Sequence, residues 1–416
     1  MTVKTEKTPV RKGTTGLILS GGGARAAYQV GVLKAVAEIL PKNVCNPFPI
    51  ICGTSAGSIN ALAIAGRAGH FRLRIRKLET IWNNLGPENV YRTDTWGVLK
   101  NSIKMLFSFL NSGYALGEPK ALLDNEPLRE LLKDYVRFRH VDEAIASGEL
   151  QAVSVTAMSY TNGQSVCFFQ GRGDLQPWER SRRVGVRTGL TVDHLMASSA
   201  IPTLFPARKI ADGFYGDGAI RQLKPISPAL HLGADKVFVI GVSDNPIHKK
   251  PHQFIRHSPS IAQIIGHMFN TAFIDSIESD LETLEMVNQL ADRLSPEERA
   301  AGGIETLRPV KYLAISPSDP IDELAADYIK ELPYSIRAFL RLTGATAHGG
   351  GISAASYLLF SRGFCRKLVE LGYRDGMKQA EDIRTFFNLN TSDDTDGKLQ
   401  IEPCREQTDQ TTACSH

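Results

Sequence analysis

The chain has 416 residues, of which 42% are hydrophobic and 22% are charged, and its net charge is +4. This length allows one large domain or two ordinary ones, and the composition is that of a globular soluble protein. The small net charge argues against a nucleic-acid-binding protein. The polar N-terminus has no apolar run behind it, and no run approaches the ~18–20 apolar residues of a membrane span. We therefore expect a cytoplasmic protein without a secretory signal peptide.

The beginning of the chain alternates strands with helices. Residues 16–20 form an apolar run typical of a buried strand, and residues 26–40 follow with helical periodicity. A second short apolar strand is predicted at 47–53, and a helix rich in small residues at 58–66. The order strand–helix–strand–helix favours a parallel sheet with covering helices.

The middle of the chain adds a hairpin and another buried strand. Residues 149–160 and 165–170 flank Asn162-Gly163, a dipeptide typical of a hairpin turn. Residues 235–243 form one more apolar run. The predicted fold class is therefore α/β, with a central, mostly parallel sheet covered by helices.

The last part of the chain is predicted to be a mainly helical extension. Residues 260–294 have the periodicity of a long amphipathic helix, and residues 310–316 resemble a strand. From residue 388 onward apolar residues are few, so we expect disorder there.

A serine in a glycine-rich turn is the first candidate for chemistry. Gly53-Thr54-Ser55-Ala56-Gly57 matches the G-x-S-x-G pattern and lies between a predicted strand and a predicted helix. Such a turn raises the serine hydroxyl above the sheet, and the flanking glycines remove side chains that would block the turn. The dipole of the following helix favours negative charge at this point. Ser55 is the candidate nucleophile; the alternative is an ordinary turn with Ser55 as the helix N-cap.

Three consecutive glycines lie between the first strand and the first helix. A dinucleotide-binding turn would need an acidic residue about 20 positions further on, and the next strand ends without one. The Gly-Lys-Ser/Thr ending of a P-loop is also missing. What remains is a loop of backbone N–H groups suited to an oxyanion. Its candidates are Gly21, Gly22, Gly23, Ala24 and Arg25, where Arg25 either anchors the loop or adds positive charge.

Four blocks of sequence, in this order, resemble the patatin-like phospholipase family: GGGARAAYQVGVL, GTSAGSINA, MASSAIPTLFPA and YGDGAIRQLKPISPA. The resemblance covers roughly residues 16–243. It implies an α/β sheet carrying a serine–aspartate dyad, with no essential histidine. It matches Ser55 to the nucleophile, Asp217 of Asp217-Gly218-Ala219 to the general base, and the glycine run to the oxyanion loop. The alternative for the Asp-Gly pair alone is a simple turn.

Two residues test how closely the resemblance holds. Ala26 follows Arg25 where the family usually has glycine, and the additional methyl group either narrows the loop or leaves it unaffected. His194 is the best-placed histidine for a conventional triad, but we expect it to be structural. An aspartate with an ordinary pKa of ~3.9 is a weak base, so the pocket of Asp217 must raise that pKa or align the proton well.

The sequence gives no sign of a metal site. His248, His252 and His257 lie in a proline-broken stretch with no visible further ligand or fixed geometry. The six cysteines lack CxxC spacing, so we expect a reduced chain with neither a zinc site nor a disulfide framework.

The expected function is that of a serine acyl hydrolase acting on lipid esters, of phospholipase A or lysophospholipase type, without metal or organic cofactor. Alternatives are a triacylglycerol lipase, thioesterase or acyltransferase with the same dyad, or a non-catalytic lipid-binding regulator. The expected partner is a lipid and not a nucleic acid. The predicted organisation is a disordered N-terminus at 1–13, a patatin-like catalytic domain at 14–243, a mainly helical region at 244–387 and a disordered tail at 388–416.

Two surface features raise the question of membrane contact. Basic residues cluster at 67–77 and at 172–187, either as solvated surface or as a contact for anionic lipid headgroups at the periphery of a membrane. Residues 101–112 are amphipathic, which predicts either core packing or a flap over the site.

Overall fold

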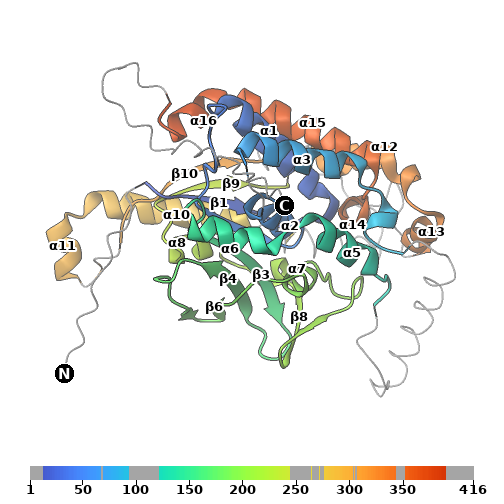
Figure 1. The fold of residues 1–416 in the computed structure, drawn as a ribbon, viewed down its shortest axis with the longest axis horizontal. Helices are drawn as coiled ribbons and strands as arrows, with labels where there is room; N and C mark the ends of the chain where they lie inside the picture. The colour runs from blue at the N-terminus through green and yellow to red at the C-terminus, as the bar shows by residue number, and fades with distance from the viewer. Residues whose placement is uncertain are drawn as a thin grey trace, which may run out of the picture.

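The chain folds as a layered α/β structure around one sheet (Figure 1). The structure, a computed structural model, describes residues 13–66, 69–92, 121–243, 264, 271, 276–302, 304, 307–342 and 352–389. Within these ranges, none of the helices combines the length and the apolar character needed to cross a membrane.

The sheet is parallel on one side and mixed on the other. Its strand order is β10-β9-β1-β2-β3-β4-β6-β5, and β8 pairs with both β3 and β7. Strands β10, β9, β1, β2 and β3 run parallel, whereas β4 and β8 are antiparallel to β3. The strands are β1 (Thr15–Leu19), β2 (Ile50–Thr54), β3 (Ala152–Ser159), β4 (Ser165–Gly171), β5 (Trp178–Arg180), β6 (Arg183–Arg187), β7 (Arg208–Ile210), β8 (Gly213–Asp217), β9 (Lys236–Ile240) and β10 (Lys311–Ile315).

Helices cover both faces of the sheet. The described helices are α1 (Ala27–Ile39), α2 (Ala56–Ala65), α3 (Phe71–Asn84), α5 (Glu126–Tyr135), α6 (Phe138–Ala146), α7 (Val192–Ser198), α8 (Ser227–His231), α10 (Ser276–Arg293), α11 (Pro296–Ala301), α12 (Ile321–Tyr328), α13 (Tyr334–Leu342), α14 (Ile352–Leu358), α15 (Arg362–Lys378) and α16 (Ala380–Phe386). Short 3₁₀ turns are η1 (Gly23–Ala26), η2 (Pro87–Asn89), η3 (Gly218–Ile220) and η6 (Ile329–Glu331).

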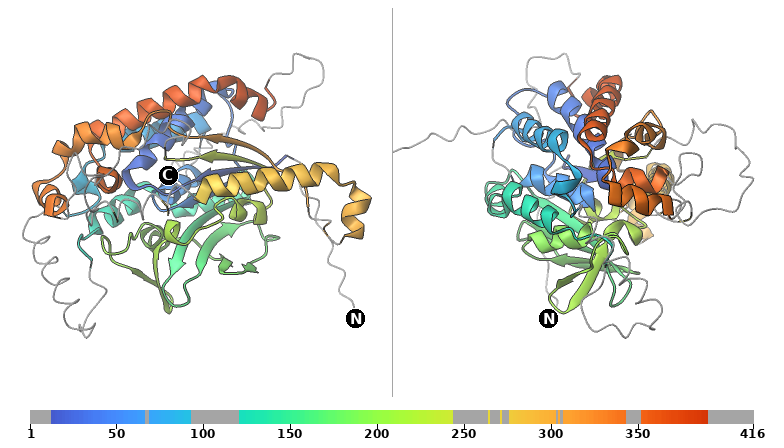
Figure 2. Two further views of the ribbon diagram at one scale, coloured as in Figure 1. Left: turned by 180° about the vertical axis from the view of Figure 1, so that it is seen from behind. Right: turned by 90° about the vertical axis from the view of Figure 1, so that its right-hand side faces the viewer.

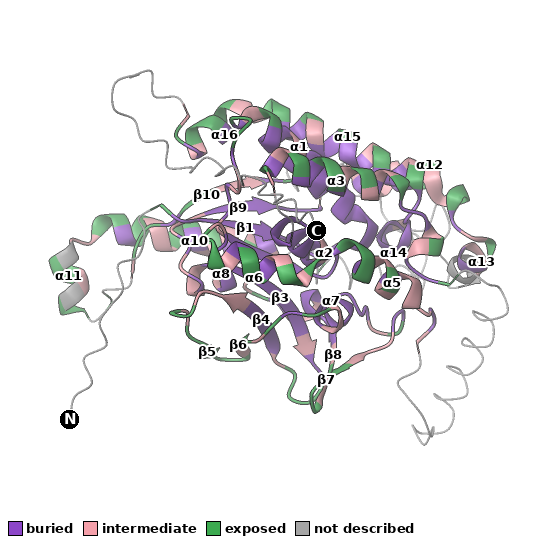
Figure 3. Cartoon of the chain, in the orientation of Figure 1, coloured by how far each residue is buried: buried purple, intermediate pink, exposed green. Residues whose placement is uncertain are grey.

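The side chains of successive residues in the central strands pack into two separate hydrophobic clusters. Leu17 and Leu19 of β1 pack into the larger cluster with α1, α2, α3 and α15, whereas Ile18 packs into the smaller one with α8 and α10. This follows from the alternation of side chains along a strand. A strand buried on both faces needs a continuous apolar run, which β1 has. Figure 3 shows the result, a buried sheet beneath helices whose outer faces are exposed.

The C-terminal helices share the main core instead of forming a separate one. Helix α15 lies along α1, as the views in Figure 2 show, and the two backbones meet at glycines. A Cβ at Gly31 would lie 2.0 Å from the carbonyl oxygen of Val369, and one at Gly372 would lie 2.1 Å from that of Tyr28. Phe387 packs against rings of the first half of the chain. One hydrophobic cluster therefore joins the described residues before 243 to those after 307.

The predicted α/β class, with its mostly parallel sheet, is confirmed. The strands predicted at the start of the chain are β1 and β2, the predicted hairpin is β3–β4, and the last predicted strand is β10. Of the helix predicted at 260–294, residues Ser276–Arg293 form α10. The amphipathic stretch 101–112, the proline-broken stretch 244–259 with its three histidines, and most of the predicted tail lie outside the described residues.

The cysteines depart from the prediction in one place. Cys45 is disulfide-bonded, so the expectation of a fully reduced chain is wrong there. The absence of CxxC spacing excludes local cysteine motifs only, so it carried no information on this bond. Cys52, Cys167 and Cys365 are buried free thiols.

Candidate active site

Ser55 occupies a strained turn between β2 and α2. Its backbone has φ 53° and ψ −130°, a conformation that residues with a side chain adopt only when the surroundings enforce it. The flanking glycines are required by packing, since a Cβ at Gly53 would lie 2.4 Å from the Cα of Ser58 and one at Gly57 would lie 2.3 Å from the carbonyl oxygen of Leu19. The predicted elbow is thus present, held tightly between β1 and the first turn of α2.

Ser198, which lies in the MASSAIPTLFPA block, also holds the turn at Ser55 in place. The backbone N–H of Ser55 donates to the hydroxyl oxygen of Ser198 at 2.8 Å, and Ser198 donates in turn to the carbonyl of Thr156 at 2.6 Å. Ser58 donates from both its N–H and its hydroxyl to the carbonyl of Ser55. The strained residue is therefore fixed by hydrogen bonds on both its N–H and its C=O.

Asp217 meets Ser55 because β8 lies antiparallel to β3. Ala157 of β3 is paired with Asp217, the last residue of β8. The hydroxyl of Ser55 donates to Oδ2 of Asp217 at 2.6 Å, and the N–H of Ala219 donates to Oδ1 at 2.9 Å. Ser55 is thus the N-cap residue of α2 by position, but its hydroxyl is directed to the carboxylate.

The glycine after Asp217 allows this approach. A Cβ at Gly218 would lie 2.1 Å from the carbonyl oxygen of Thr156. The turn expected of an Asp-Gly pair is also present, since Oδ1 of Asp217 caps η3 through Ala219. One carboxylate oxygen therefore holds the turn while the other faces the serine.

The Asp217 carboxylate is fully buried, with 0% of its surface exposed. Burial raises its pKa to about 7, and the hydrogen bonds from Ser55 and from the N–H of Ala219 oppose this rise by stabilising the charged form. A carboxylate with a pKa near neutrality accepts a proton far more readily than an ordinary one. Of the two alternatives expected from the sequence, a raised pKa or good alignment of the proton, this is the first.

The glycine loop lies beside the serine. Gly21 follows the end of β1, and Gly23, which opens η1, lines the same pocket as Ser55. Gly23 has φ +54°, and a Cβ there would lie 2.2 Å from the carbonyl oxygen of Tyr357, while one at Gly22 would lie 2.5 Å from a methyl group of Val242. Val242 and Tyr357 therefore fill the space that side chains at residues 22 and 23 would need.

The side chain of Arg25 anchors the loop to the C-terminal helices. Its Nε donates to the hydroxyl of Ser356 at 2.8 Å, and a terminal nitrogen lies 2.5 Å from Oδ1 of Asp322. The guanidinium also lies 4.1 Å from the ring centre of Tyr357. Of the two roles weighed for Arg25, these contacts match anchoring.

The two alanines flanking Arg25 are part of the core. Ala24 and Ala26 are fully buried in the main hydrophobic cluster. The carbonyl of Ala26 accepts a hydrogen bond from the amide of Asn60 at 3.1 Å. The methyl group that departs from the usual family sequence is therefore accommodated by packing.

His194 is placed at the start of α7. Its Nδ1 accepts a hydrogen bond from the N–H of Thr191 at 3.1 Å, and its ring packs edge-on against Phe168 at 4.7 Å. Burial lowers its pKa to about 4, so the ring is neutral at physiological pH. These contacts are those of a helix cap, in the manner of a capping box.

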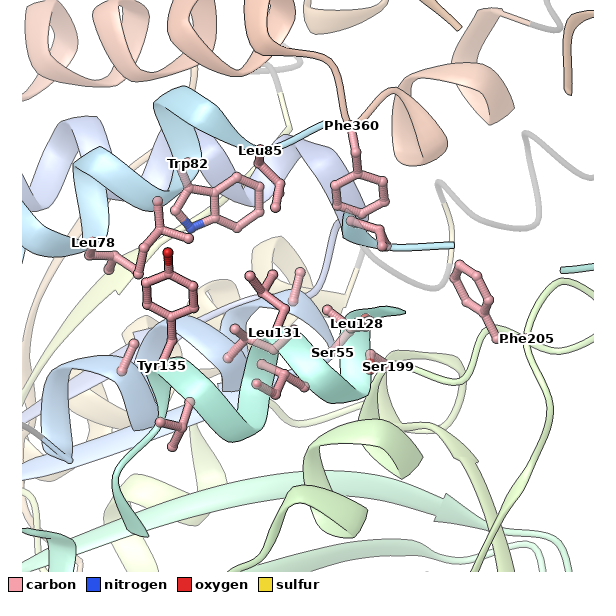
Figure 4. A pocket seen from close by; sticks show the side chains of 18 of the residues that line it. Ser55, Leu78, Trp82, Leu85, Leu128, Leu131, Tyr135, Ser199, Phe205 and Phe360 are labelled. Carbon is pink, nitrogen blue, oxygen red and sulfur yellow. The ribbon is translucent and has the colours of Figure 1, made fainter. Parts of the chain in front are cut away.

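An apolar pocket opens beside Ser55, and the sequence reasoning did not identify it. Figure 4 shows Ser55 and Ser199 between Phe205 on one side and Tyr135 and Leu78 on the other. The lining comes mainly from α2, α3 and α5, and consists of Gly23, Ser55, Ala56, Ile59, Ala63, Leu78, Ile81, Trp82, Leu85, Val90, Leu128, Leu131, Leu132, Tyr135, Val136, Ser199, Ile201, Phe205 and Phe360. The available signal was the amphipathic pattern of α3 and α5, which also fits helices packed on a core.

Several basic residues of the two clusters have structural contacts. Arg74 is 1% exposed and is paired with Glu149, and Arg72 donates to carbonyls at the end of α1. Arg187 donates to carbonyls of the 171–175 turn. These contacts favour the structural reading for Arg72, Arg74 and Arg187 over direct headgroup binding.

No group of three or more potential metal ligands occurs among the residues that the structure describes. The hydroxyl of Ser55 beside a buried carboxylate is suited to attack on an acyl carbonyl. The glycine loop is suited to an oxyanion, and the apolar pocket to a hydrocarbon chain.

Comparison with known proteins identifies the family. The family model described as patatin-like phospholipase matches residues 17–230. The calcium-independent phospholipase A2-gamma of Rattus norvegicus is 25% identical over 226 residues, which cover 54% of this chain and 26% of that protein. The cGAMP-activated phospholipase of Pseudomonas aeruginosa is 27% identical over 217 residues, which cover 52% of this chain and 55% of that protein.

Among solved structures, this chain is similar to the human GIVD cytosolic phospholipase A2 in complex with methyl gamma-linolenyl fluorophosphonate. The alignment covers 91% of this chain and 60% of that chain, with 12% identity and a TM-score of 0.40, and we draw no argument from this likeness. The curated relatives match over about half of this chain, and the match spans 26% and 55% of their own lengths. The segment that matches the family model, by contrast, is just over half of the chain, and it contains Ser55, Asp217 and the glycine loop. The chain belongs to the patatin-like phospholipase family.

Proposed function

We propose that this protein hydrolyses fatty-acyl ester bonds of lipids, as a phospholipase A or lysophospholipase, through a dyad of Ser55 and Asp217. The observation that carries the proposal is the 2.6 Å hydrogen bond from the Ser55 hydroxyl to the buried Asp217 carboxylate. A serine hydroxyl becomes a useful nucleophile when an adjacent base accepts its proton. The names of the matched relatives, which are phospholipases, support lipid esters as the substrate class.

In the first step the Ser55 oxygen attacks the acyl carbonyl while its proton passes to Oδ2 of Asp217. The carbonyl oxygen becomes negative, and the N–H groups of Gly22, Gly23 and Ala24 are proposed to receive it, aided by the dipole of α2. The N–H of Ser55 itself is engaged by Ser198. Protonated Asp217 then gives the proton to the leaving alcohol, and the acyl group remains on Ser55.

In the second step water replaces the alcohol. Asp217, again ionised, accepts a proton from the water, whose oxygen attacks the acyl-enzyme. As the bond to Ser55 breaks, Asp217 returns this proton to the Ser55 oxygen and the fatty acid leaves. Both steps use the same oxyanion loop and the same carboxylate. The apolar lining next to Ser55 is suited to the hydrocarbon part of the acyl group.

The first test is labelling with a fluorophosphonate probe. We expect the probe to label the wild-type protein on Ser55 and to leave folded Ser55→Ala unlabelled. Equal labelling of both proteins would contradict the assignment of the nucleophile. A wild-type protein that binds lipid vesicles but is neither labelled nor active on any ester would instead be a lipid-binding regulator.

The second test separates the activities that share this chemistry. Purified protein would be assayed against phospholipids, lysophospholipids, acylglycerols and acyl-CoA thioesters, with Ser55→Ala as the blank. We expect the highest kcat/KM on phospholipids or lysophospholipids. A clear preference for acylglycerols, for thioesters, or for transfer to an added alcohol would replace the phospholipase with a lipase, a thioesterase or an acyltransferase.

A further inference from the structure

One face of α2 runs from the serine into the depth of the pocket. Ala56, Ile59 and Ala63 all line the pocket, and Ser55 lies at the N-terminal end of this stripe. Residues spaced by three and four positions lie on the same face of a helix. The nucleophile and the pocket wall are therefore parts of one rigid element.

Two further helices form the other walls along the same direction. Figure 4 shows Leu128 of α5 near Ser55 and Tyr135 of α5 at the far side, close to Leu78 of α3. From residue 128 to residue 135 a helix rises about 10 Å. The pocket is thus lined by α5 over about the same length as by α2, and by α3 over a shorter length.

The length of α2 between Ser55 and the last lining residue follows from helix geometry. From Ser55 to Ala63 a helix rises about 12 Å. An extended chain of single bonds advances about 1.2 Å per bond, as judged from the reach of an extended peptide. A straight acyl chain that reaches Ala63 from an ester on Ser55 therefore has roughly ten carbons.

We infer that α2 acts as a ruler for the acyl chain, and that the far end of the pocket, lined by Ala63 of α2 and Tyr135 of α5, sets the longest acyl group that binds straight, about the length of a decanoyl chain. This rests on the proposed function, because it requires an acyl group on Ser55. Ala63 is 4% exposed, so a larger side chain there must occupy the pocket or displace its walls. Residues nearer to Ser55 on the same stripe would shorten the accepted chain further.

The test uses p-nitrophenyl esters of increasing length, from butyryl through octanoyl and decanoyl to myristoyl. In Ala63→Phe the ring takes the place of the end of the acyl chain. Each methylene that loses its apolar contacts lowers kcat/KM about fourfold, so losing about three methylenes lowers it about fiftyfold for decanoyl esters. The readout is the ratio of decanoyl to butyryl kcat/KM, because a butyryl chain ends before Ala63 and reports any effect of the ring on the site as a whole.

A second variant makes the test graded. Ile59 lies about 6 Å nearer to Ser55 along α2, so Ile59→Phe should lower the ratio of octanoyl to butyryl hydrolysis as well as the ratio of decanoyl to butyryl hydrolysis. A general packing defect would lower all chain lengths together and would not follow the position of the substitution. Melting temperatures of both variants identify the folded proteins to be compared.

A third variant works in the opposite sense and does not depend on packing a ring into the core. Tyr135 is 40% exposed, and Tyr135→Ala opens the far end, so myristoyl hydrolysis should rise relative to decanoyl. Tyr312 of β10, which is 36% exposed and outside the pocket lining, provides the matched control in Tyr312→Ala.

The outcomes are distinct from those of the proposed function. If folded Ala63→Phe retains decanoyl hydrolysis, or loses butyryl and decanoyl hydrolysis in equal proportion, the ruler is refuted even though fluorophosphonate labelling of Ser55 persists. An unchanged chain-length profile in Tyr135→Ala also counts against it. If wild-type protein is neither labelled nor active on the butyryl ester, the proposed function itself fails.

Discussion

The buried carboxylate of Asp217 should make the protein less stable than it would be with a neutral group in its place. Burial raises the pKa of this carboxyl from 3.8 to about 7. The folded protein therefore retains a proton that the unfolded chain releases between about pH 4 and pH 7. Stability contributed by the protonated form is lost as the pH rises through this window. The full shift corresponds to about 4 kcal/mol, at ~1.4 kcal/mol per pKa unit.

Asp217→Asn removes this titration while keeping the size of the side chain. An amide oxygen can still accept from the N–H of Ala219, so the turn before η3 keeps its cap. We expect the variant to gain stability over wild type as the pH rises from about 4 to 7, by up to about 4 kcal/mol. The variant should at the same time lose esterase activity.

The assay is urea unfolding of both proteins across this pH range, with the free energies of unfolding subtracted at each pH. Asp174→Asn serves as a control, because the hydrogen bond from Arg172 lowers the pKa of the Asp174 carboxyl instead of raising it. A difference between wild type and Asp217→Asn that stays constant from about pH 4 to pH 7 would refute the reasoning.

Three further predictions concern activity on a soluble ester. Since Asp217 must be ionised to accept a proton, kcat/KM should rise about tenfold from about pH 6 to pH 8, and a flat profile would contradict the role of its raised pKa. Asp217→Asn should lower the rate by about 10²–10⁴, while folded His194→Ala should cost much less; the reverse order would indicate a histidine-dependent triad. Ser198→Ala removes the acceptor for the N–H of Ser55 and should lower kcat about tenfold or more with little change in KM, because the strained turn relaxes while the pocket remains. A parallel loss of melting temperature and KM would show that Ser198 acts only on the fold.

The elbow was predictable from sequence because its constraints are local. Gly53, Ser55 and Gly57 lie within one turn. Each glycine leaves out a Cβ that would clash with that turn or with the neighbouring strand. The meeting of Ser55 with Asp217 is different in kind, since it joins residues 162 positions apart and depends on the pairing of β8 with β3. No spacing rule gives such a pairing, and only the resemblance to the family indicated it.

The pocket was not predictable because its walls look like ordinary core helices. Leu128, Leu132 and Tyr135 recur at helical spacing on α5, and such a stripe has the same pattern whether it faces a packed core or a cavity. The cap formed by His194 and Thr191 is local, whereas the bond from Ser55 to Ser198 joins residues 143 positions apart. Long-range hydrogen bonds of this kind require the fold to be known.

The region that supports the site extends beyond the segment that matches the family. The match ends at residue 230, yet the guanidinium of Arg25 binds Asp322 and Ser356, and Gly23 lies against the backbone of Tyr357. A buried guanidinium needs a counter-charge and hydrogen-bond acceptors, because an unpaired buried charge is strongly unfavourable. Since the N–H groups proposed to hold the oxyanion belong to residues 22–24, their positions depend on partners from α12 and α14. In this chain the C-terminal helices are therefore a structural part of the candidate active site, and differences there would alter the oxyanion loop without touching Ser55 or Asp217.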